Sequence, residues 1–94
     1  MSRSGSAPDL ARIFKALSVD TRVRIVQALQ EQALCVNALA ARLEVTHSAV
    51  SQHLRILREA GLVVAEKRGY WVHYRLNENT VQEWAEAIAG FLGR

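Results

Sequence analysis

The polar side chains with the clearest chemical use recur on one side of residues 47–59. If that segment is a helix, Ser48, Gln52 and Arg55 lie opposite its apolar residues. Glutamine can bond an adenine edge, arginine a guanine edge or a phosphate, and serine a phosphate oxygen. The pattern therefore predicts a helix that reads DNA in the major groove. Each residue taken alone fits an ordinary solvated helix face equally well.

A second amphipathic helix precedes this one with a very short connection. Residues 36–43 are apolar at intervals of three and four, and only residues 44–46 separate the two helices. Such a tight turn makes both helices direct their apolar faces to one core, as in a helix-turn-helix. Thr46 can cap the second helix and Asn37 the first. We therefore expect residues 37–60 to form a DNA-binding helix-turn-helix.

Two β-branched runs, residues 62–66 and 71–76, come directly after this unit. Gly61 precedes them and fits the left-handed position that ends a helix. The runs are joined by the sequence Lys-Arg-Gly-Tyr, which predicts a hairpin with a basic tip over residues 62–76. A basic hairpin placed after a recognition helix is a wing, whose tip would meet a minor groove or the adjacent backbone. An ordinary charged turn is the alternative.

Two more helices are expected before the helix-turn-helix. The first begins near Ala7 with Ser6 as its cap, and the second covers residues 21–30 with Asp20 as its cap. Arg22 lies off the apolar line of the second helix, so we expect it to be solvated, as we do the neighbouring Arg24. A short strand is expected over residues 33–36.

The last helix, residues 77–93 with Asn77 as cap, carries a long aromatic and apolar stripe. A core this small cannot cover that stripe together with the one on the first helix. Surplus apolar surface on terminal helices favours a homodimer over closure of a monomer core. The predicted interface residues are Leu10, Phe14, Leu17, Trp84, Ile88 and Phe91.

Length and charge fit one small domain that works on nucleic acid. The 94 residues, half of them hydrophobic, predict a single domain over residues 1–94 with a disordered tail over residues 1–6. Of the net charge of +3, residues 42–75 hold six Lys/Arg and three Asp/Glu, whereas residues 76–94 hold one and three. The basic middle should therefore face the polyanion. No run approaches the roughly 18 apolar residues of a membrane span, and the start lacks a signal peptide, so we expect a cytoplasmic protein.

Enzymatic chemistry is not expected. The sequence has no nucleophile and base at a meaningful spacing, no glycine-rich phosphate loop and no set of metal ligands. Cys35 is the only cysteine and permits no internal disulfide. We expect it to be a small apolar residue, with a redox-reactive thiol as the minority interpretation. No cofactor and no metal are predicted.

From Phe14 to Leu76 the sequence resembles the ArsR-type (arsenical-resistance regulator) winged-helix repressors. The resemblance rests on FKALSVDTRVRIVQAL, LCVNALAARL, THSAVSQHLRILREAGLV and a wing ending in HYRL. It implies the order helix, helix, strand, helix, recognition helix, two-stranded wing and final helix, in a dimer formed by the first and last helices. With the polar pattern above, it gives the predicted DNA-binding residues Thr46, His47, Ser48, Ser51, Gln52, His53, Arg55, Arg68, Gly69 and Arg75.

The resemblance also implies a repressor that leaves its operator when an inducer binds, commonly a metal or metalloid ion. Many members hold that ion with a Cys-Val-Cys triplet, but here the triplet is Cys35, Val36 and Asn37. One thiolate remains, so the family's cysteine-pair site is lacking and any small inducer is unidentified. Two alternatives to an operator-binding repressor stay open: a winged-helix module that binds protein, and a repressor that responds to oxidation of Cys35.

Overall fold

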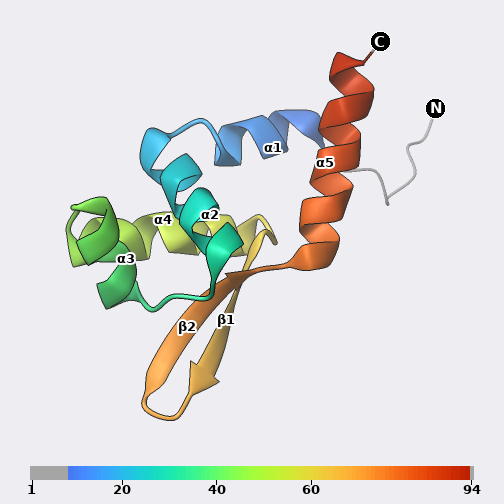
Figure 1. The fold of residues 1–94 in the computed structure, drawn as a ribbon. Helices are drawn as coiled ribbons and strands as arrows, with labels where there is room; N and C mark the ends of the chain where they lie inside the picture. The colour runs from blue at the N-terminus through green and yellow to red at the C-terminus, as the bar shows by residue number, and fades with distance from the viewer. Residues whose placement is uncertain (1–8, 94) are drawn as a thin grey trace.

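The computed structural model describes residues 9–93. Within that range the chain forms five helices and one antiparallel hairpin (Figure 1). In chain order they are α1 (Leu10–Ala16), α2 (Asp20–Glu31), α3 (Val36–Leu43), α4 (His47–Glu59), β1 (Val63–Arg68), β2 (Trp71–Leu76) and α5 (Glu78–Leu92). The mainly helical fold with a hairpin wing is confirmed. None of the described helices is long and apolar enough to cross a membrane.

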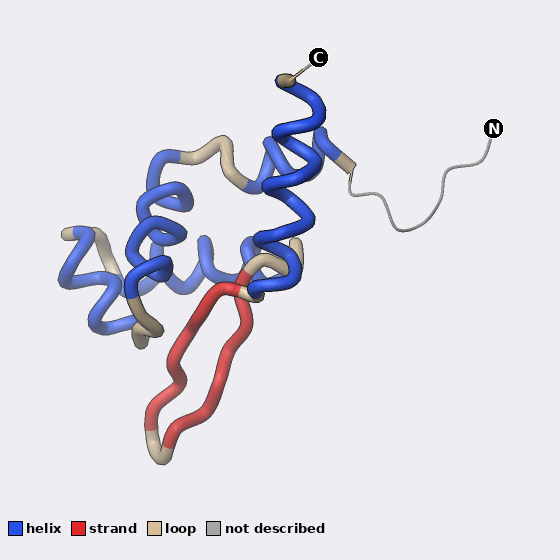
Figure 2. Tube along the Cα trace, turned by 45° about the vertical axis from the view of Figure 1, so that its right-hand side comes forward, coloured by secondary structure: helices blue, strands red, loops and turns tan. Residues whose placement is uncertain are grey.

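One apolar core joins the helices to the base of the hairpin. Its six largest fully buried side chains are Ile13, Ile25, Leu39, Val50, Leu54 and Leu57. Burial of one such side chain stabilises the fold by about 1.5–3 kcal/mol. Figures 1 and 2 show the hairpin projecting from this helical body, with its turn at the opposite end of the molecule from the C-terminal end of α5.

The start of the first helix was predicted wrongly. The helix begins at Leu10, and its cap is Asp9, whose Oδ1 accepts a hydrogen bond from the Ala11 N–H at 3.0 Å. Ser6 and Ala7 lie outside the described residues, as does the predicted tail over residues 1–6. The Asp9 carboxylate also accepts a hydrogen bond from the Arg12 N–H at 3.4 Å, so one short side chain satisfies two backbone donors and defines the start of the helix.

The start of α2 and the position of Arg22 also differ from the prediction. Asp20 is the first helical residue and Val19 its cap, without a side-chain hydrogen bond. Arg22 is only 8% exposed. Its Nε donates to the Ala16 carbonyl at 2.7 Å and its Nη2 to the Lys15 carbonyl at 3.1 Å. The last carbonyls of α1 thus supply the acceptors that a buried guanidinium needs.

The predicted strand over residues 33–36 is reduced to a single bridge. Leu34 and Tyr74 exchange backbone hydrogen bonds of 3.0 and 2.8 Å. The strand cannot extend further, because α3 already begins at Val36 with Cys35 as its cap. The prediction that Asn37 caps this helix was therefore wrong, since Asn37 lies inside its first turn.

The helix-turn-helix itself follows the prediction closely. Glu44 ends α3 in the left-handed conformation, with φ of 58°, and only Val45 and Thr46 remain before α4. At the other end of α4, Gly61 has φ of +85° and its N–H bonds the Arg58 carbonyl at 2.9 Å. This left-handed glycine ends the recognition helix as predicted.

The hairpin turn is shorter than predicted. Lys67 and Arg68 are strand residues that pair with Val72 and Trp71, so only Gly69 and Tyr70 connect the strands. Gly69 has φ of +64°. A left-handed glycine is typical of two-residue hairpin turns because it matches the twist of the paired strands.

Candidate nucleic-acid interface

The recognition helix α4 is fixed at its start and along its inner side. Thr46 Oγ1 accepts a hydrogen bond from the Ala49 N–H at 3.0 Å, which caps the helix as predicted. Val50, Leu54 and Leu57 are buried in the core. Because these anchors hold the inner face, the outward side chains have a defined direction relative to the hairpin.

The outer face of α4 carries a continuous row of exposed polar residues. Ser48 and Gln52 lie one turn apart near the start of the helix, and Arg55 follows on the same face. The structure exposes these predicted DNA-binding residues on or beside α4: Thr46, His47, Ser48, Ser51, Gln52 and Arg55. Hydrogen-bonding groups near a helix start are suited to the base edges of a major groove.

His53 does not belong to that exposed row. It is half-buried, and its Nδ1 lies 3.4 Å from Nη1 of Arg22. Burial, and secondly the charge of Arg22, lower the pKa of His53 below its ordinary value. The lowered pKa favours the neutral imidazole, whose Nδ1 can accept a hydrogen bond from the Arg22 guanidinium N–H. The resemblance assigned His53 to DNA, whereas its observed partner is a side chain of α2.

The predicted arginines of the wing are held by one carboxylate. Nη2 of Arg68 lies 3.1 Å from Oε1 of Glu66, and Nε of Arg75 lies 3.2 Å from its Oε2. These hydrogen bonds, that from Arg68 foremost, lower the pKa of Glu66. Exposed ion pairs of this kind add little stability, so a phosphate can replace the carboxylate at small cost.

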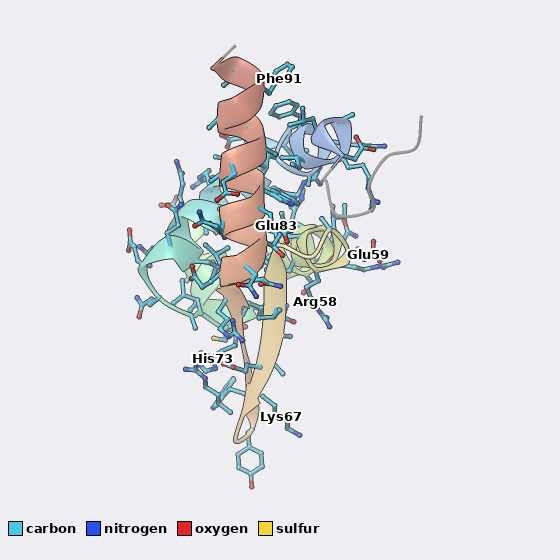
Figure 3. The ribbon with its side chains drawn as sticks, turned by 90° about the vertical axis from the view of Figure 1, so that its right-hand side faces the viewer. Arg58, Glu59, Lys67, His73, Glu83 and Phe91 are labelled. Atoms are coloured by element: carbon cyan, nitrogen blue, oxygen red, sulfur yellow. The ribbon has the colours of Figure 1, made fainter. Side chains whose placement is uncertain are left out.

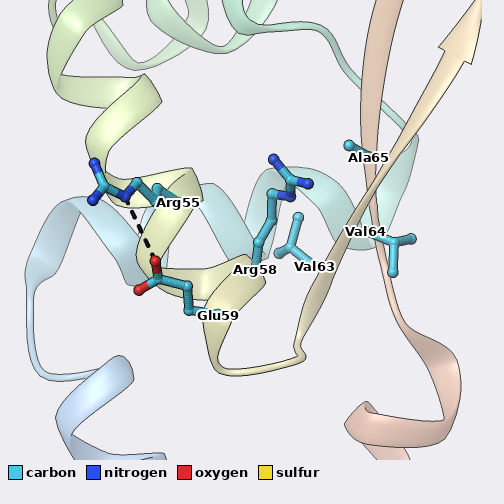
Figure 4. A pocket seen from close by; sticks show the side chains of 6 residues that line it. All are labelled: Arg55, Arg58, Glu59, Val63, Val64 and Ala65. Carbon is cyan, nitrogen blue, oxygen red and sulfur yellow. Dashed lines mark ion pairs between the residues drawn. The ribbon is translucent and has the colours of Figure 1, made fainter.

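A groove between α4 and β1 brings together residues that the sequence analysis did not combine. It has a volume of about 540 Å³ and is lined by Arg55, Arg58, Glu59, Val63, Val64 and Ala65 (Figure 4). Arg55 pairs with Glu59 across 3.5 Å. Arg58 has no ion pair within residues 9–93. The sequence analysis did not include Arg58 among the DNA-binding residues. Its position three residues after Arg55 could have indicated that it borders the same helix face.

Lys67 lies on the same side of the hairpin as this groove. Figure 3 shows Arg58 and Lys67 projecting to one side, while His73 lies on the other. Alternation along β1 places Arg68 on the face opposite to Lys67. The arginines at the groove are thus Arg55 and Arg58. The predicted Arg68 and Arg75 form a separate cluster with Glu66 on the outer face of the wing.

The residues around Cys35 do not complete a metal site. Cys35 and His47 both line a hollow of about 150 Å³, together with Val36, Asn37, Trp71 and Val72. Among residues 9–93, no group of three His, Cys, Asp or Glu side chains could hold a metal ion. A tetrahedral structural site needs four ligands, and these two side chains supply at most half of that set.

The predicted dimer residues divide between exposed and buried positions. The rings of Phe14 and Phe91 lie 5.8 Å apart at an angle of 56°, and both remain exposed. Leu10, Leu17 and Ile88 are half-buried. Trp84 is only 9% exposed because it packs into the core of its own protomer, so it has little surface left for a partner. The free apolar surface therefore lies at Phe14 and toward the C-terminal end of α5.

A tight helix-turn-helix with a hairpin after its second helix defines the winged helix-turn-helix class of proteins. Comparison with known proteins identifies the family within that class. Residues 20–64 match the family described as bacterial regulatory protein, arsR family. The chain is 42% identical over 78 residues to the arsenical resistance operon repressor of Escherichia coli K12, covering 82% of this chain and 66% of that protein. It is 33% identical to the uncharacterized HTH-type transcriptional regulator YbzH of Bacillus subtilis, covering 81% and 91%. The chain belongs to the arsR family.

Solved structures agree with this assignment. A possible transcriptional regulator for arsenical resistance has a TM-score of 0.75 and 38% identity, covering 83% of this chain and 81% of that one. The homodimeric winged helix-turn-helix DNA-binding domain of Mb0332 from Mycobacterium bovis has a TM-score of 0.73 and 28% identity, covering 85% and 75%. The chain spans 66%, 59% and 65% of the length of the first three curated relatives it matches.

Proposed function

We propose that the chain is a dimeric transcriptional repressor that binds an inverted-repeat operator in double-stranded DNA. The observation that carries this proposal is the anchored helix α4, whose outward row runs from Ser48 through Gln52 to Arg55. The proposed function implies a cytoplasmic location, where bacterial DNA lies. Family membership and the homodimeric state of the Mycobacterium bovis domain support it.

The contacts divide by chemistry into those that read bases and those that position the protein. Gln52 and Ser48 lie near the start of the helix and read base edges in the major groove. Arg58 lines the groove between helix and wing, and Lys67 projects to the same side of the hairpin. Both side chains bind the phosphates of a strand that passes along this side. Arg68 and Arg75 reach phosphate after exchange with Glu66.

Dimerisation is proposed through α1 and α5. Phe14 and Phe91 offer an exposed aromatic surface that a second copy of the chain would cover. A two-fold dimer matches the two-fold symmetry of an inverted repeat, with half-sites about one helical turn, roughly 10 bp, apart.

Replacement of Gln52 by alanine tests the base-reading role. The operator is first selected from a pool of random duplexes with the wild-type protein. Gln52→Ala should then weaken operator binding by about 1–3 kcal/mol and leave binding to a scrambled duplex unchanged. Gln30→Ala, which removes an exposed glutamine from α2, is the matched control.

Two results would contradict the proposal at different levels. Equal weakening of both duplexes by Gln52→Ala would show that Gln52 does not read bases. If the wild-type protein selected no duplex and bound none, the winged-helix module that binds protein would be the better interpretation.

A further inference from the structure

A cavity between α1 and the end of α4 contains none of the residues proposed to contact DNA. It has a volume of about 370 Å³, within the range of about 300–1,000 Å³ that is usual for small-molecule sites. Three cations line it, Arg12 and Lys15 from α1 and Arg22 from α2. Apolar side chains complete the lining, with Ile56 of α4 the largest. The cavity therefore combines positive charge with an apolar wall.

Arg22 brings a buried positive charge to this cavity. Its guanidinium is only 8% exposed, and its acceptors are two backbone carbonyls of α1 and the ring of His53. The carbonyls are neutral, the pKa of His53 is lowered in favour of the neutral ring, and Arg22 forms no ion pair within residues 9–93. A buried charge without a counterion is costly, so an anion that reaches Arg22 gains free energy.

The guanidinium of Arg22 still has donors to offer. It carries five N–H bonds, and three of them are used by the Ala16 carbonyl, the Lys15 carbonyl and Nδ1 of His53. One N–H bond remains on each terminal nitrogen. A pair of guanidinium N–H bonds can hold both oxygens of one carboxylate, which makes a carboxylate the best-matched anion.

The exposed residues of the cavity also favour an anion. Arg12 and Lys15 are exposed and form no ion pair with another described residue. Glu59, the acidic residue of the lining, is paired with Arg55 across 3.5 Å (Figure 4). Ile56 is 41% exposed and offers an apolar contact beside these charges. A ligand that satisfies both features is an anion with an apolar body.

The proposed dimer leaves this cavity open. Phe14 follows Arg12 by two residues in α1, which places the two side chains on nearly opposite sides of the helix. A second copy of the chain that covers Phe14 therefore does not cover Arg12. A small molecule can reach the cavity in the dimer as it does in the protomer.

We propose that this cavity binds a small organic carboxylate with a compact apolar body, and that the bound carboxylate lowers the affinity of the protein for its operator. The inference rests on the proposed function and names the chemical class of an inducer. A carboxylate held by the remaining N–H bonds draws the guanidinium of Arg22 into the cavity and away from His53, whose contact of 3.4 Å is already long. His53 directly follows Gln52 on α4, so ligand binding loosens a contact that holds the recognition helix.

Benzoate is a suitable probe because it joins a carboxylate to a compact ring. Titration of benzoate into isotope-labelled protein should move the amide NMR signals of Lys15, Ala16 and Ala60 in a saturable way, since these residues line the cavity. Acetate lacks the ring and benzamide lacks the charge. Each should bind about tenfold more weakly than benzoate.

Variants of the lining assign the binding to this cavity. Arg12→Gln with Lys15→Gln removes the two exposed cations and should weaken benzoate binding about fivefold, with an unchanged thermal melting curve. Lys67→Gln with Arg68→Gln removes the same charge from the wing and is the matched control, which should bind benzoate like the wild type. Arg22→Lys keeps the charge but cannot hold both carboxylate oxygens, so it should lose binding. The Arg12 and Lys15 double variant decides the question even if Arg22→Lys does not fold.

Operator binding is then measured at constant ionic strength, with benzoate in place of chloride. Saturating benzoate should lower the operator affinity of the wild type by about fivefold or more. The Arg12→Gln, Lys15→Gln variant should need about five times more benzoate for the same loss.

The outcomes separate this inference from the proposed function. Shifts confined to other surfaces, equal binding of acetate and benzoate, or an operator affinity that benzoate does not change would each overturn the inference and leave the proposed function standing. The NMR titration uses no DNA. A protein that binds benzoate in the cavity but binds no duplex would therefore refute the proposed function and the inducer role, and would leave the carboxylate site itself supported.

Discussion

Removal of the Glu66 charge should strengthen DNA binding, and the structure allows the size of the effect to be worked out. Glu66 holds Arg68 at 3.1 Å and Arg75 at 3.2 Å, so one carboxylate offsets part of the positive charge of the wing. Glu66→Gln keeps the size and an oxygen acceptor but removes the negative charge. Each wing then gains one positive charge for phosphate.

The gain should depend on salt in a defined way. One further phosphate contact per subunit is two per dimer, and each contact adds about 0.9 to the slope of log affinity against log salt. The slope should therefore steepen by about 1.8. When salt is lowered fourfold, from about 200 to about 50 mM, the advantage of Glu66→Gln over the wild type should grow about twelvefold.

Fluorescence anisotropy of a labelled scrambled duplex, measured at four or more salt concentrations, gives both slopes. Glu83→Gln makes the same change in charge on α5, away from the wing, and should follow the wild type (Figure 3). The double variant Glu66→Gln with Arg68→Ala should lose most of the gain. Parallel lines for Glu66→Gln and the wild type would refute the reasoning, because they would mean that the Glu66 cluster does not face DNA.

Three further outcomes are expected. Phe91→Asp should convert the dimer to monomer in sedimentation at micromolar concentration, since it places a charge in the exposed apolar surface of α5; a wild-type protein that already sediments as a monomer would contradict the interface. Because the pKa of His53 is lowered in the folded protein, the unfolded chain binds more protons at pH values just below the ordinary value of 6.5. The free energy of unfolding in urea should therefore decrease as the pH is lowered through that window, and the decrease should be smaller in His53→Gln. Cys35→Ser should leave DNA binding and any response to arsenite, cadmium or zinc unchanged in mobility-shift assays, because Cys35 and His47 are too few ligands for a metal ion. Loss of a metal response in this variant would show that Cys35 does bind a metal ion.

Helices whose apolar residues recur at regular helical spacing could be predicted from the sequence. Val50, Leu54 and Leu57 recur at helical spacing, and the structure buries all three. Thr46 and Gly61 mark the two ends of α4 by side-chain and backbone chemistry that acts within a few residues. The helix-turn-helix could be located because its signals are local.

Features that depend on distant partners could not be predicted. Arg22 is buried because the carbonyls of α1 happen to end beside it, and no period in α2 carries that information. Glu66 meets Arg75 only once the register of the hairpin is known. Arg58 lines a groove only because β1 lies opposite it, and the helical spacing of α4 says nothing about where β1 lies.

The guanidinium of Arg22 has a mechanical consequence. It joins the last carbonyls of α1 to His53 on α4, so the helix beside α5 and the helix proposed to read DNA are fastened by one buried side chain. In a dimer formed through α1 and α5, the distance between the two recognition helices is then set by the packing around Phe14 and Phe91. If the proposed dimer forms, the spacing of the operator half-sites would therefore depend on how Phe14 and Phe91 pack at the interface, although neither side chain would touch DNA.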